Sequence, residues 1–329
     1  MTTAEILAAI PKLSTLVVGD ICLDRWCTYD PSTSEPSRET GIERIGVVRT
    51  EVTAGAGGTV ANNLAALGCG RVAVLGAIGE DGFGLELARA LADRGISDLC
   101  VRAAAMQTFT YTKVINGETG IEDRPRLDFI RTVPLDPPVE RLIVERLTDN
   151  AAAFDAVIVA DQAETSRGGV ITRAVRDALA GLARAHGGAV YLADSRARIA
   201  HFRGAIAKPN RQEGEAACRA LFGEVDYLKL RQHLEAPLLM VTHGPDGVLL
   251  VEEGGERWVR TRAVENPVDI CGAGDSFSAG VSLALAAGAT PTEAAEFGNL
   301  VASITIMKKG TGTASPAEVR EQCRLWQSI

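Results

Sequence analysis

The sequence is short of aromatic residues, of histidines and of long apolar runs, and each shortage excludes a class of protein. Phe, Trp and Tyr make up only 5% of the 329 residues, too few for the stacking surfaces that bind single-stranded nucleic acid. Acidic residues outnumber basic ones by 42 to 34, which argues against a phosphate-binding face of clustered Lys and Arg. The four histidines are scattered and do not suit a zinc site. No apolar run approaches the roughly 18 residues of a membrane span. We therefore expect no nucleic-acid partner and no membrane insertion.

Cysteine is sparse and shows no paired pattern. The seven cysteines are an odd number without a CxxC pair, unlike the dense, even-numbered sets of secreted disulfide proteins. Residues 1–20 lack the basic segment and long apolar stretch of a signal peptide. With 46% hydrophobic and 23% charged residues the composition is that of a globular protein. These features predict a cytoplasmic protein with reduced thiols that acts on a small molecule.

Short apolar runs alternate with helical patterns along the chain, which is typical of a mostly parallel sheet covered by helices. The predicted buried strands are Leu16–Val18, Val72–Leu75, Ala156–Val159, Val190–Leu192 and Leu238–Val241. The predicted helices are Val60–Leu67, Gly84–Arg94, Val139–Ala152, Gly169–Ala185, Gln212–Leu221, Ser276–Ala287, Thr292–Met307 and Pro316–Trp326. Several strands end in Gly or Asp, and ligands of such α/β sheets bind beyond the carboxyl ends of the strands. We therefore expect a cleft at that edge.

Two segments, 25–54 and 100–132, interrupt this alternation. The first contains the strand-like run Ile45–Val52, and the second contains Phe109–Ile115, a turn at Asn116-Gly117, and Leu127–Arg131. Asn-Gly between alternating residues indicates a hairpin. We predict that both segments form one small sheet that projects from a single domain of residues 1–329, either as a lid over the cleft or as a dimer contact.

The segment Asn266–Phe277 is the most informative for chemistry. The small residues Gly272, Ala273 and Gly274 run directly into a helical pattern, and backbone amides at a helix N-terminus form an anion site. Asp275 lies in that first turn, where a carboxylate would repel a phosphate. A general base that takes a proton from an attacking hydroxyl explains its presence. The alternative is a simple helix N-cap, and the local pattern does not decide between the two.

The stretch Asp269–Phe277 closely resembles the C-terminal motif of the ribokinase-like (PfkB) carbohydrate kinases. The resemblance covers essentially the whole chain, because further segments match in family order: Val17–Arg25, Gly55–Gly68, Val74–Gly84, Lys208–Glu213, Thr242–Gly244 and Lys309–Thr313. It implies a three-layer α/β fold with a mostly parallel central sheet, flanking helices and a small β-sheet lid. It also implies ATP-dependent phosphorylation of a hydroxyl of a sugar or sugar phosphate.

The resemblance assigns roles to individual residues. Asp275 would be the catalytic base, with Gly272, Ala273 and Gly274 as the anion hole. The sugar side would comprise Asp24, Gly55, Gly57, Asn63, Lys113, Asp161 and Arg196. The ATP side would comprise Thr242, Gly244, Asn299 and Gly310, with Asn210 and Glu213 holding Mg²⁺ through water and Asp269 near a site for a monovalent cation such as K⁺. Purely structural roles stay open for some of these residues: a capping box for Asn210 and Glu213, a strand-end cap for Asp161, and a solvated strand lysine for Lys113.

Within the family the sequence is most similar to the D-glycero-heptose phosphate kinases of lipopolysaccharide precursor synthesis. The cues are Gly19–Trp26, the insertion Ser37–Val52, Arg126–Phe129 and Phe297–Asn299. That kinase is often fused to a nucleotidyltransferase; the chain ends at Ile329, so we expect any second activity to belong to another protein. We also expect a homodimer formed through the lid.

Three departures from the family pattern affect the substrate. Thr59 stands where the family usually has its first Asn after the glycines, and Cys271 replaces a common Thr. The lysine that usually follows the strand end at Asp194 is absent, so Arg196 or Arg198 would serve as the phosphate clamp; Arg126 and Arg131 flank the lid. Alternatives are another acceptor, such as a fructose phosphate, ribose or a nucleoside, and a catalytically silent family member that binds sugar or nucleotide.

Overall fold

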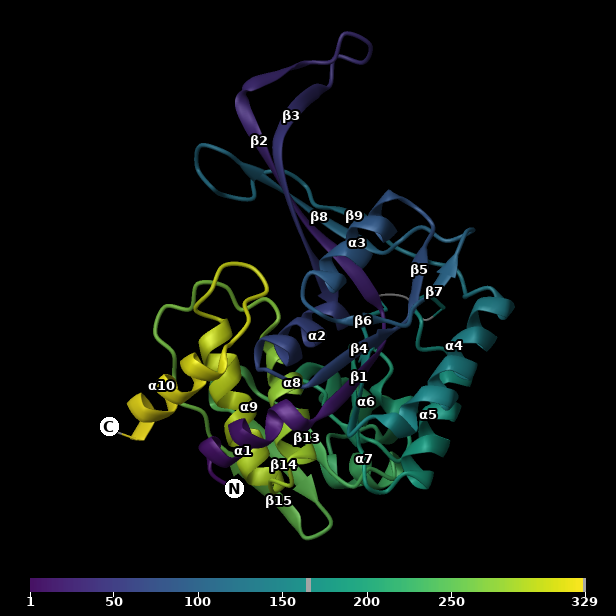
Figure 1. The fold of residues 1–329 in the computed structure, drawn as a ribbon, viewed down its shortest axis with the longest axis vertical. Helices are drawn as coiled ribbons and strands as arrows, with labels where there is room; N and C mark the ends of the chain where they lie inside the picture. The colour runs from purple at the N-terminus through teal and green to yellow at the C-terminus, as the bar shows by residue number, and fades with distance from the viewer. Residues whose placement is uncertain (164–166, 328–329) are drawn as a thin grey trace.

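The computed structural model describes residues 1–163 and 167–327. A nine-stranded sheet forms its centre, in the order β15-β14-β13-β12-β11-β10-β1-β4-β6 (Figure 1). The strands from β6 to β13 are parallel, and β14 and β15 extend the sheet antiparallel. Their bounds are β1 Ser14–Gly19, β4 Arg71–Leu75, β6 Ser97–Asp98, β10 Ala156–Asp161, β11 Val190–Ser195, β12 Ile206–Ala207, β13 Leu239–Thr242, β14 Val248–Glu252 and β15 Gly255–Val259.

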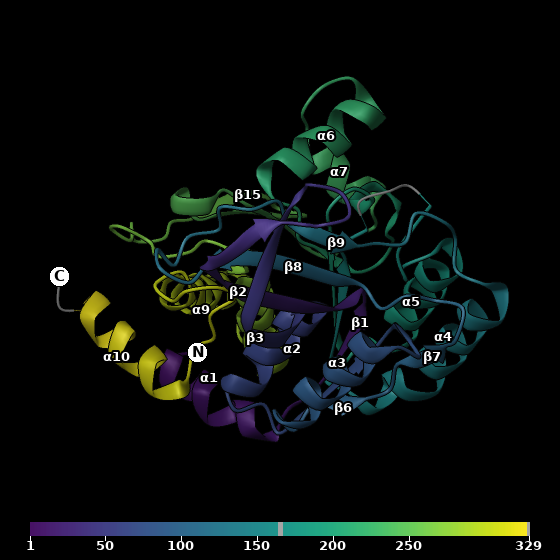
Figure 2. The ribbon, with the colours of Figure 1, turned by 90° about the horizontal axis from the view of Figure 1, so that it is seen from above.

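Helices cover both faces of this sheet and complete three layers (Figures 1 and 2). They are α1 Thr3–Ala9, α2 Gly57–Ala66, α3 Gly82–Ala92, α4 Pro137–Asn150, α5 Arg173–Ala185, α6 Arg211–Phe222, α7 Tyr227–His233, α8 Ala273–Ala286, α9 Pro291–Thr305 and α10 Pro316–Gln327. The predicted strands and helices are all found, with ends that differ by a few residues. The short helices α1 and α7, the short strands β5, β6 and β12, and the hairpin β14–β15 were not predicted, because elements of two to seven residues carry little periodicity.

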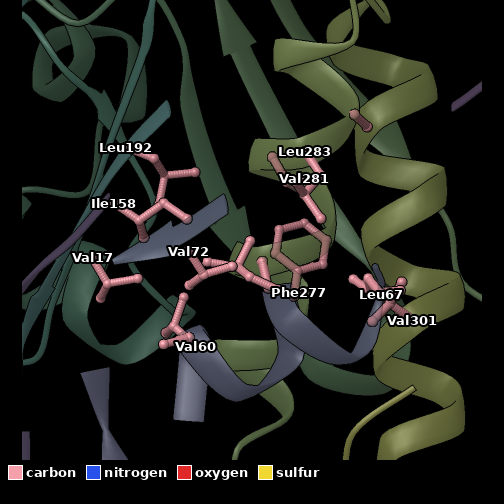
Figure 3. Close-up of a cluster of buried hydrophobic side chains, with 14 of the residues drawn as sticks. Val17, Val60, Leu67, Val72, Ile158, Leu192, Phe277, Val281, Leu283 and Val301 are labelled. Carbon is pink, nitrogen blue, oxygen red and sulfur yellow. The ribbon is translucent and has the colours of Figure 1, made fainter. Parts of the chain in front are cut away.

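The alternation of side chains along each strand divides the core between the two faces. Val17, Ile158 and Leu192 point to the face covered by α2, α8 and α9 (Figure 3). Their neighbours in sequence, such as Val157 and Val159, pack on the face covered by α4 to α7. Since successive strand residues point to opposite faces, the position of a residue in its strand decides which helices it meets.

The two segments that interrupt the alternation pair into one four-stranded sheet, as predicted. Its order is β3-β2-β8-β9, with β2 Ile21–Pro36, β3 Glu43–Ala56, β8 Thr110–Asn116 and β9 Leu127–Phe129. The hairpin of β2 and β3 projects far from the main body (Figure 1). Asn116 and Gly117 do form a turn, but β8 and β9 pair only after a longer excursion, with Thr112 opposite Leu127. The predicted tight hairpin is therefore a wider loop.

Two further features complete the description. A separate pair of short parallel strands, β5 Ala77–Gly79 and β7 Val101–Ala103, lies beside α3 and α4. Over the described ranges, no helix is both long enough and apolar enough to cross a bilayer.

Candidate active site

The N-terminus of α8 opens at the carboxyl edge of the sheet. Gly272 is its N-cap, with a φ of +78°, a left-handed conformation that favours glycine. In the part of the chain that the structure describes, no side chain caps this turn. The amide of Ala273 donates to the carbonyl of Ile270 at 3.2 Å. Gly272 lines the cavity, so an anion bound there would meet the N-terminal end of the helix.

Asp275 is the third residue of α8, so it is not the N-cap of that helix. Its carboxyl is half-buried at the base of the cavity. Burial, helped by the nearby Asp194 carboxylate, raises the pKa of Asp275 to about 7, while Lys208 and Arg196 oppose the rise. A carboxylate with a pKa near neutrality is well matched to general-base catalysis.

Asp24 on β2 faces the same cavity from the lid. Gly55, on the adjacent strand β3, makes room for it: a Cβ built on Gly55 would lie 2.3 Å from the Asp24 carboxylate. Burial raises the pKa of Asp24 to about 6, although Lys113 and Arg126 act to lower it. The structure thus brings together Asp24, Gly55 and Asp275, which lie far apart in the sequence.

The cavity has a volume of about 210 Å³ and combines these carboxylates with four cations, Arg25, Lys113, Arg126 and Arg196. Lys113 on β8 is 3.6 Å from Glu122. Arg126 is 2.6 Å from Asp128 and lies over the ring of Tyr111. The remaining lining residues include Arg196, Thr59, Trp26, Cys271, Gly272, Gly310 and Thr311.

The structure places Arg126 and Asn63 differently from what the sequence suggested. Arg126, only noted there as flanking the lid, lines the cavity because the chain turns into β9 immediately after it. Thr59 lines the cavity from α2, whereas Asn63 is fully buried one turn later. There its Nδ2 donates to the carbonyl of Thr59.

Asp161 lies apart from this group. It is 1% exposed, forms an ion pair with Arg198, and accepts a hydrogen bond of 2.6 Å from Ser195 Oγ. Its place in β10 puts it on the same face as Val159, away from α8. The same ion pair buries Arg198, so Arg196 is the arginine of this segment that reaches the cavity. Gly57 also lies apart, packed so that a Cβ would be 2.7 Å from Ile21.

Of the residues expected on the ATP side, Gly310 lines the cavity described above. Asn210, Glu213, Thr242 and Gly244 lie at or just after the ends of β12 and β13. Asn210 and Glu213 form a reciprocal capping box at the start of α6: Asn210 Oδ1 accepts from the Glu213 amide, and Glu213 Oε2 accepts from the Asn210 amide. Thr242 bridges to Asn210, and Gly244 follows with a φ of +57°. Asn299 on α9 is 8% exposed, and its Nδ2 is buried without a hydrogen-bond partner among the described residues.

Asp269 ties two loops together beneath the cavity. One carboxylate oxygen accepts from the amide of Cys271 at 2.9 Å, and the other accepts from the amide of Gly310 at 3.1 Å. These two hydrogen bonds hold the loop before α8 and the loop after α9 together next to the N-terminus of α8.

A carboxylate at a helix N-terminus, facing a second carboxylate under a small β-sheet on a three-layer α/β scaffold, is the arrangement expected of a phosphotransferase that acts on an alcohol. The profile described as "pfkB family carbohydrate kinase" matches residues 14–129 and 148–318. The chain belongs to this family and is a sugar kinase.

Relatives agree with this assignment. The "Bifunctional protein HldE" of Pelobacter propionicus is 31% identical over 324 residues, which are 96% of this chain and 64% of that protein. The chain therefore spans less than two thirds of the length of this curated relative. Ribokinase from Thermotoga maritima has the same fold, with a TM-score of 0.69 at 21% identity, covering 95% of this chain and 99% of that one. Phosphofructokinase-2 from Escherichia coli in complex with potassium gives 0.68 at 18% identity, covering 95% and 99%.

Proposed function

We propose that the chain transfers a phosphoryl group from ATP to a hydroxyl of a sugar phosphate, in particular a heptose phosphate. The observation that carries this proposal is the set of cations Arg25, Lys113, Arg126 and Arg196 in one cavity with Asp24 and Asp275. A neutral sugar needs no such set, whereas a phosphate is bound well by Lys and by the planar fork of Arg. The resemblance of Gly19–Trp26 and Arg126–Phe129 to heptose phosphate kinases supports the same substrate class.

In this mechanism Asp24 orients the sugar by accepting hydrogen bonds from its hydroxyls, and Asp275 removes the proton from the attacking hydroxyl. The amides of Gly272, Ala273 and Gly274 then stabilise the negative charge on the transferring group. Positioning and electrostatics provide most of the acceleration, as is general for phosphoryl transfer.

The residues present fit a Mg²⁺ ion held through water and phosphate oxygens. Burial, with the nearby Asp194 carboxylate, raises the pKa of Glu213, and such a concentration of negative charge favours a cation. Across residues 1–163 and 167–327, no three His, Cys, Asp or Glu side chains are grouped as a direct metal site. Mg²⁺ keeps several waters and needs only one or two carboxylates, which Glu213 with Asn210 would supply. Bound there, the ion would neutralise charge on the phosphates of ATP.

Two further parts of the proposal concern the loops and the lid. The loops joined by Asp269 would hold a monovalent cation such as K⁺, as the potassium complex of phosphofructokinase-2 from Escherichia coli suggests.

The projecting hairpin of β2 and β3 would form a homodimer contact. Val47 and Val48 on β3 are 48% and 65% exposed there, and an uncovered strand edge with apolar side chains favours pairing.

A coupled assay of ATP use against matched pairs of free and phosphorylated sugars tests the proposal. We expect turnover with a heptose phosphate and a higher Michaelis constant for the free sugar. Arg126→Ala should raise the Michaelis constant for the sugar phosphate about 10- to 100-fold, the loss of one charge-assisted contact, with little change for ATP. Arg124→Ala is the matched control, because Arg124 pairs with Glu43 outside the cavity. Equal use of a free sugar and its phosphate would contradict the sugar phosphate assignment.

A further inference from the structure

Lys208 is a buried lysine beside the transfer site. It lies two residues before Asn210, the first residue of the capping box with Glu213, and is 3% exposed. Its amide donates to the carbonyl of Ala193 at 2.9 Å, which anchors the backbone to the end of β11. Lysine is almost never buried without a partner, so the surroundings of its ammonium group define its role.

The partner of Lys208 is Asp194, at the end of β11. Lys208 Nζ lies 2.9 Å from Asp194 Oδ2, and the same oxygen accepts a hydrogen bond of 3.1 Å from Ser278 Oγ. Asp194 shares a strand face with Leu192 and so points toward α8. Ser278 lies three residues after Asp275 in α8, on the adjacent turn. The pair therefore connects the sheet to the helix turn that carries the base.

The ammonium group also lies beside the anion hole. A Cβ placed on Gly274 would have Lys208 Nζ at 3.7 Å. The ion pair of 2.9 Å between Lys208 Nζ and Asp194 Oδ2 fixes the position of the ammonium group there. The buried ammonium of Lys208 thus lies near the N-terminus of α8, near Asp275 and near the capping box of Asn210 and Glu213.

We propose that Lys208 is a positioning residue for phosphoryl transfer: held by Asp194, its buried ammonium fixes the first turns of α8 and balances the carboxylates around the anion hole. This inference rests on the proposed role of Asp275. Apolar residues can replace a buried ion pair without loss of stability. Stability alone therefore does not explain why the ion pair places the Lys208 ammonium next to Gly274.

The test compares Lys208→Met with Arg198→Met, which breaks the other buried ion pair at the neighbouring strand end. Both single variants leave a buried carboxylate unpaired and lose stability. The double variant Asp194→Asn/Lys208→Met removes both charges and keeps the comparison possible if Lys208→Met folds poorly.

The first readout needs no sugar. Titration of ¹³C-labelled aspartate carboxyls by NMR, with Asp275→Asn to identify the resonance, measures the pKa of Asp275. We expect Lys208→Met to raise that pKa by about one unit, because an opposite charge nearby is lost, and the double variant to return it toward the wild-type value. Arg198→Met should leave it unchanged. The ionisable groups around Asp275 that enter this titration are Cys22, Asp24, Asp194, Arg196, Lys208 and Cys271.

The second readout is kinetic. We expect kcat of Lys208→Met and of the double variant to fall about 10²-fold through misplacement of the base, with Michaelis constants within about threefold of wild type. An unchanged pKa of Asp275 in Lys208→Met, or a kcat no lower than that of Arg198→Met, would overturn the role of Lys208. Wild-type protein that transfers phosphate to no sugar would instead refute the proposed function, while the NMR titration still decides whether Lys208 acts on Asp275.

Discussion

At the scale of single residues, Asp275 combines two properties that conflict in an ordinary helix. It lies in the first turn of α8, where the helix dipole favours a carboxylate, yet burial and Asp194 raise its pKa to about 7. The ionised form is therefore costly in the folded protein. A general base in the free enzyme with this pKa predicts that kcat/KM is lost as the pH falls through about 7.

Asp275→Asn should separate the contribution of this residue to turnover from its effect on folding stability. We expect turnover to fall by about 10²- to 10⁴-fold, the range for loss of a general base, with nucleotide binding retained. The folded-state pKa lies above the unfolded value of 3.8, so the folded protein binds more protons between pH 4 and 7 and loses stability as the pH rises through that window. The variant should therefore melt at a higher temperature than wild type at pH 8, and the difference should vanish near pH 4. Near-normal turnover of the folded variant would contradict the mechanism.

Single residues also show how much of the site can be predicted from the sequence. The position of Gly272 and Asp275 at the start of α8 could be predicted because the local segment, glycines followed by a helix, determines it. The role of Asp275 as a base came from the family resemblance instead. Asp161 and Asp194 look alike in sequence, since both end a buried strand, yet Asp161 turns to Arg198 and Asp194 to α8. The face that each strand end presents depends on strand register and on which helix packs there. Neither the strand register nor the packing of that helix can be predicted from the local sequence.

At the scale of elements, the site depends on how closely β3 packs against β2. Cys22 pairs with Gly55, and Asp24 pairs with Thr53, so the Asp24 carboxylate lies over the Gly55 backbone. The sequence pattern predicted a strand at Ile45–Val52 in β3 but not β2, and only the register shows that Gly55 makes room for a side chain of the site. A glycine in a strand often marks such a close approach.

Gly55→Ala should therefore displace the Asp24 carboxylate without unfolding the protein. A methyl group 2.3 Å from that carboxylate forces the side chain aside, and we expect the Michaelis constant for the sugar to rise about tenfold or more, with that for ATP nearly unchanged. Gly181→Ala is the matched control, because a Cβ there meets nothing within 4 Å and alanine stabilises a helix interior by about 0.5–1 kcal/mol. Steady-state kinetics with both substrates varied provides the measurement; equal effects of the two variants would show that Gly55 is not required for Asp24.

At the scale of the whole molecule, the hairpin of β2 and β3 is the part least supported by the rest of the chain. It extends far beyond the body (Figure 1), and most of β3 from Glu43 to Val52 is exposed. Ile42, Val48 and Val52 are 71%, 65% and 38% exposed. A long edge strand with apolar side chains is a template for pairing with another chain, so a second copy that covers β3 would bury this surface.

We therefore expect the protein to sediment as a dimer at micromolar concentration and Val48→Lys to shift it toward the monomer. The lysine places a charge at the centre of the proposed contact, where burying it without a partner is strongly unfavourable, and the dissociation constant should rise by at least about tenfold, equivalent to about 1.4 kcal/mol. Leu142→Lys is the matched control, because Leu142 lies on α4 away from the hairpin and is 42% exposed. Sedimentation velocity over a range of concentrations measures the shift. If the wild type stays monomeric throughout, or if both variants dissociate equally, the lid is not the dimer contact.

Because β2 carries Asp24 at one end and the hairpin at the other, a dimer held through this strand would also stiffen the sugar side of the cavity. The monomeric variant should then show a higher Michaelis constant for the sugar and an unchanged one for ATP.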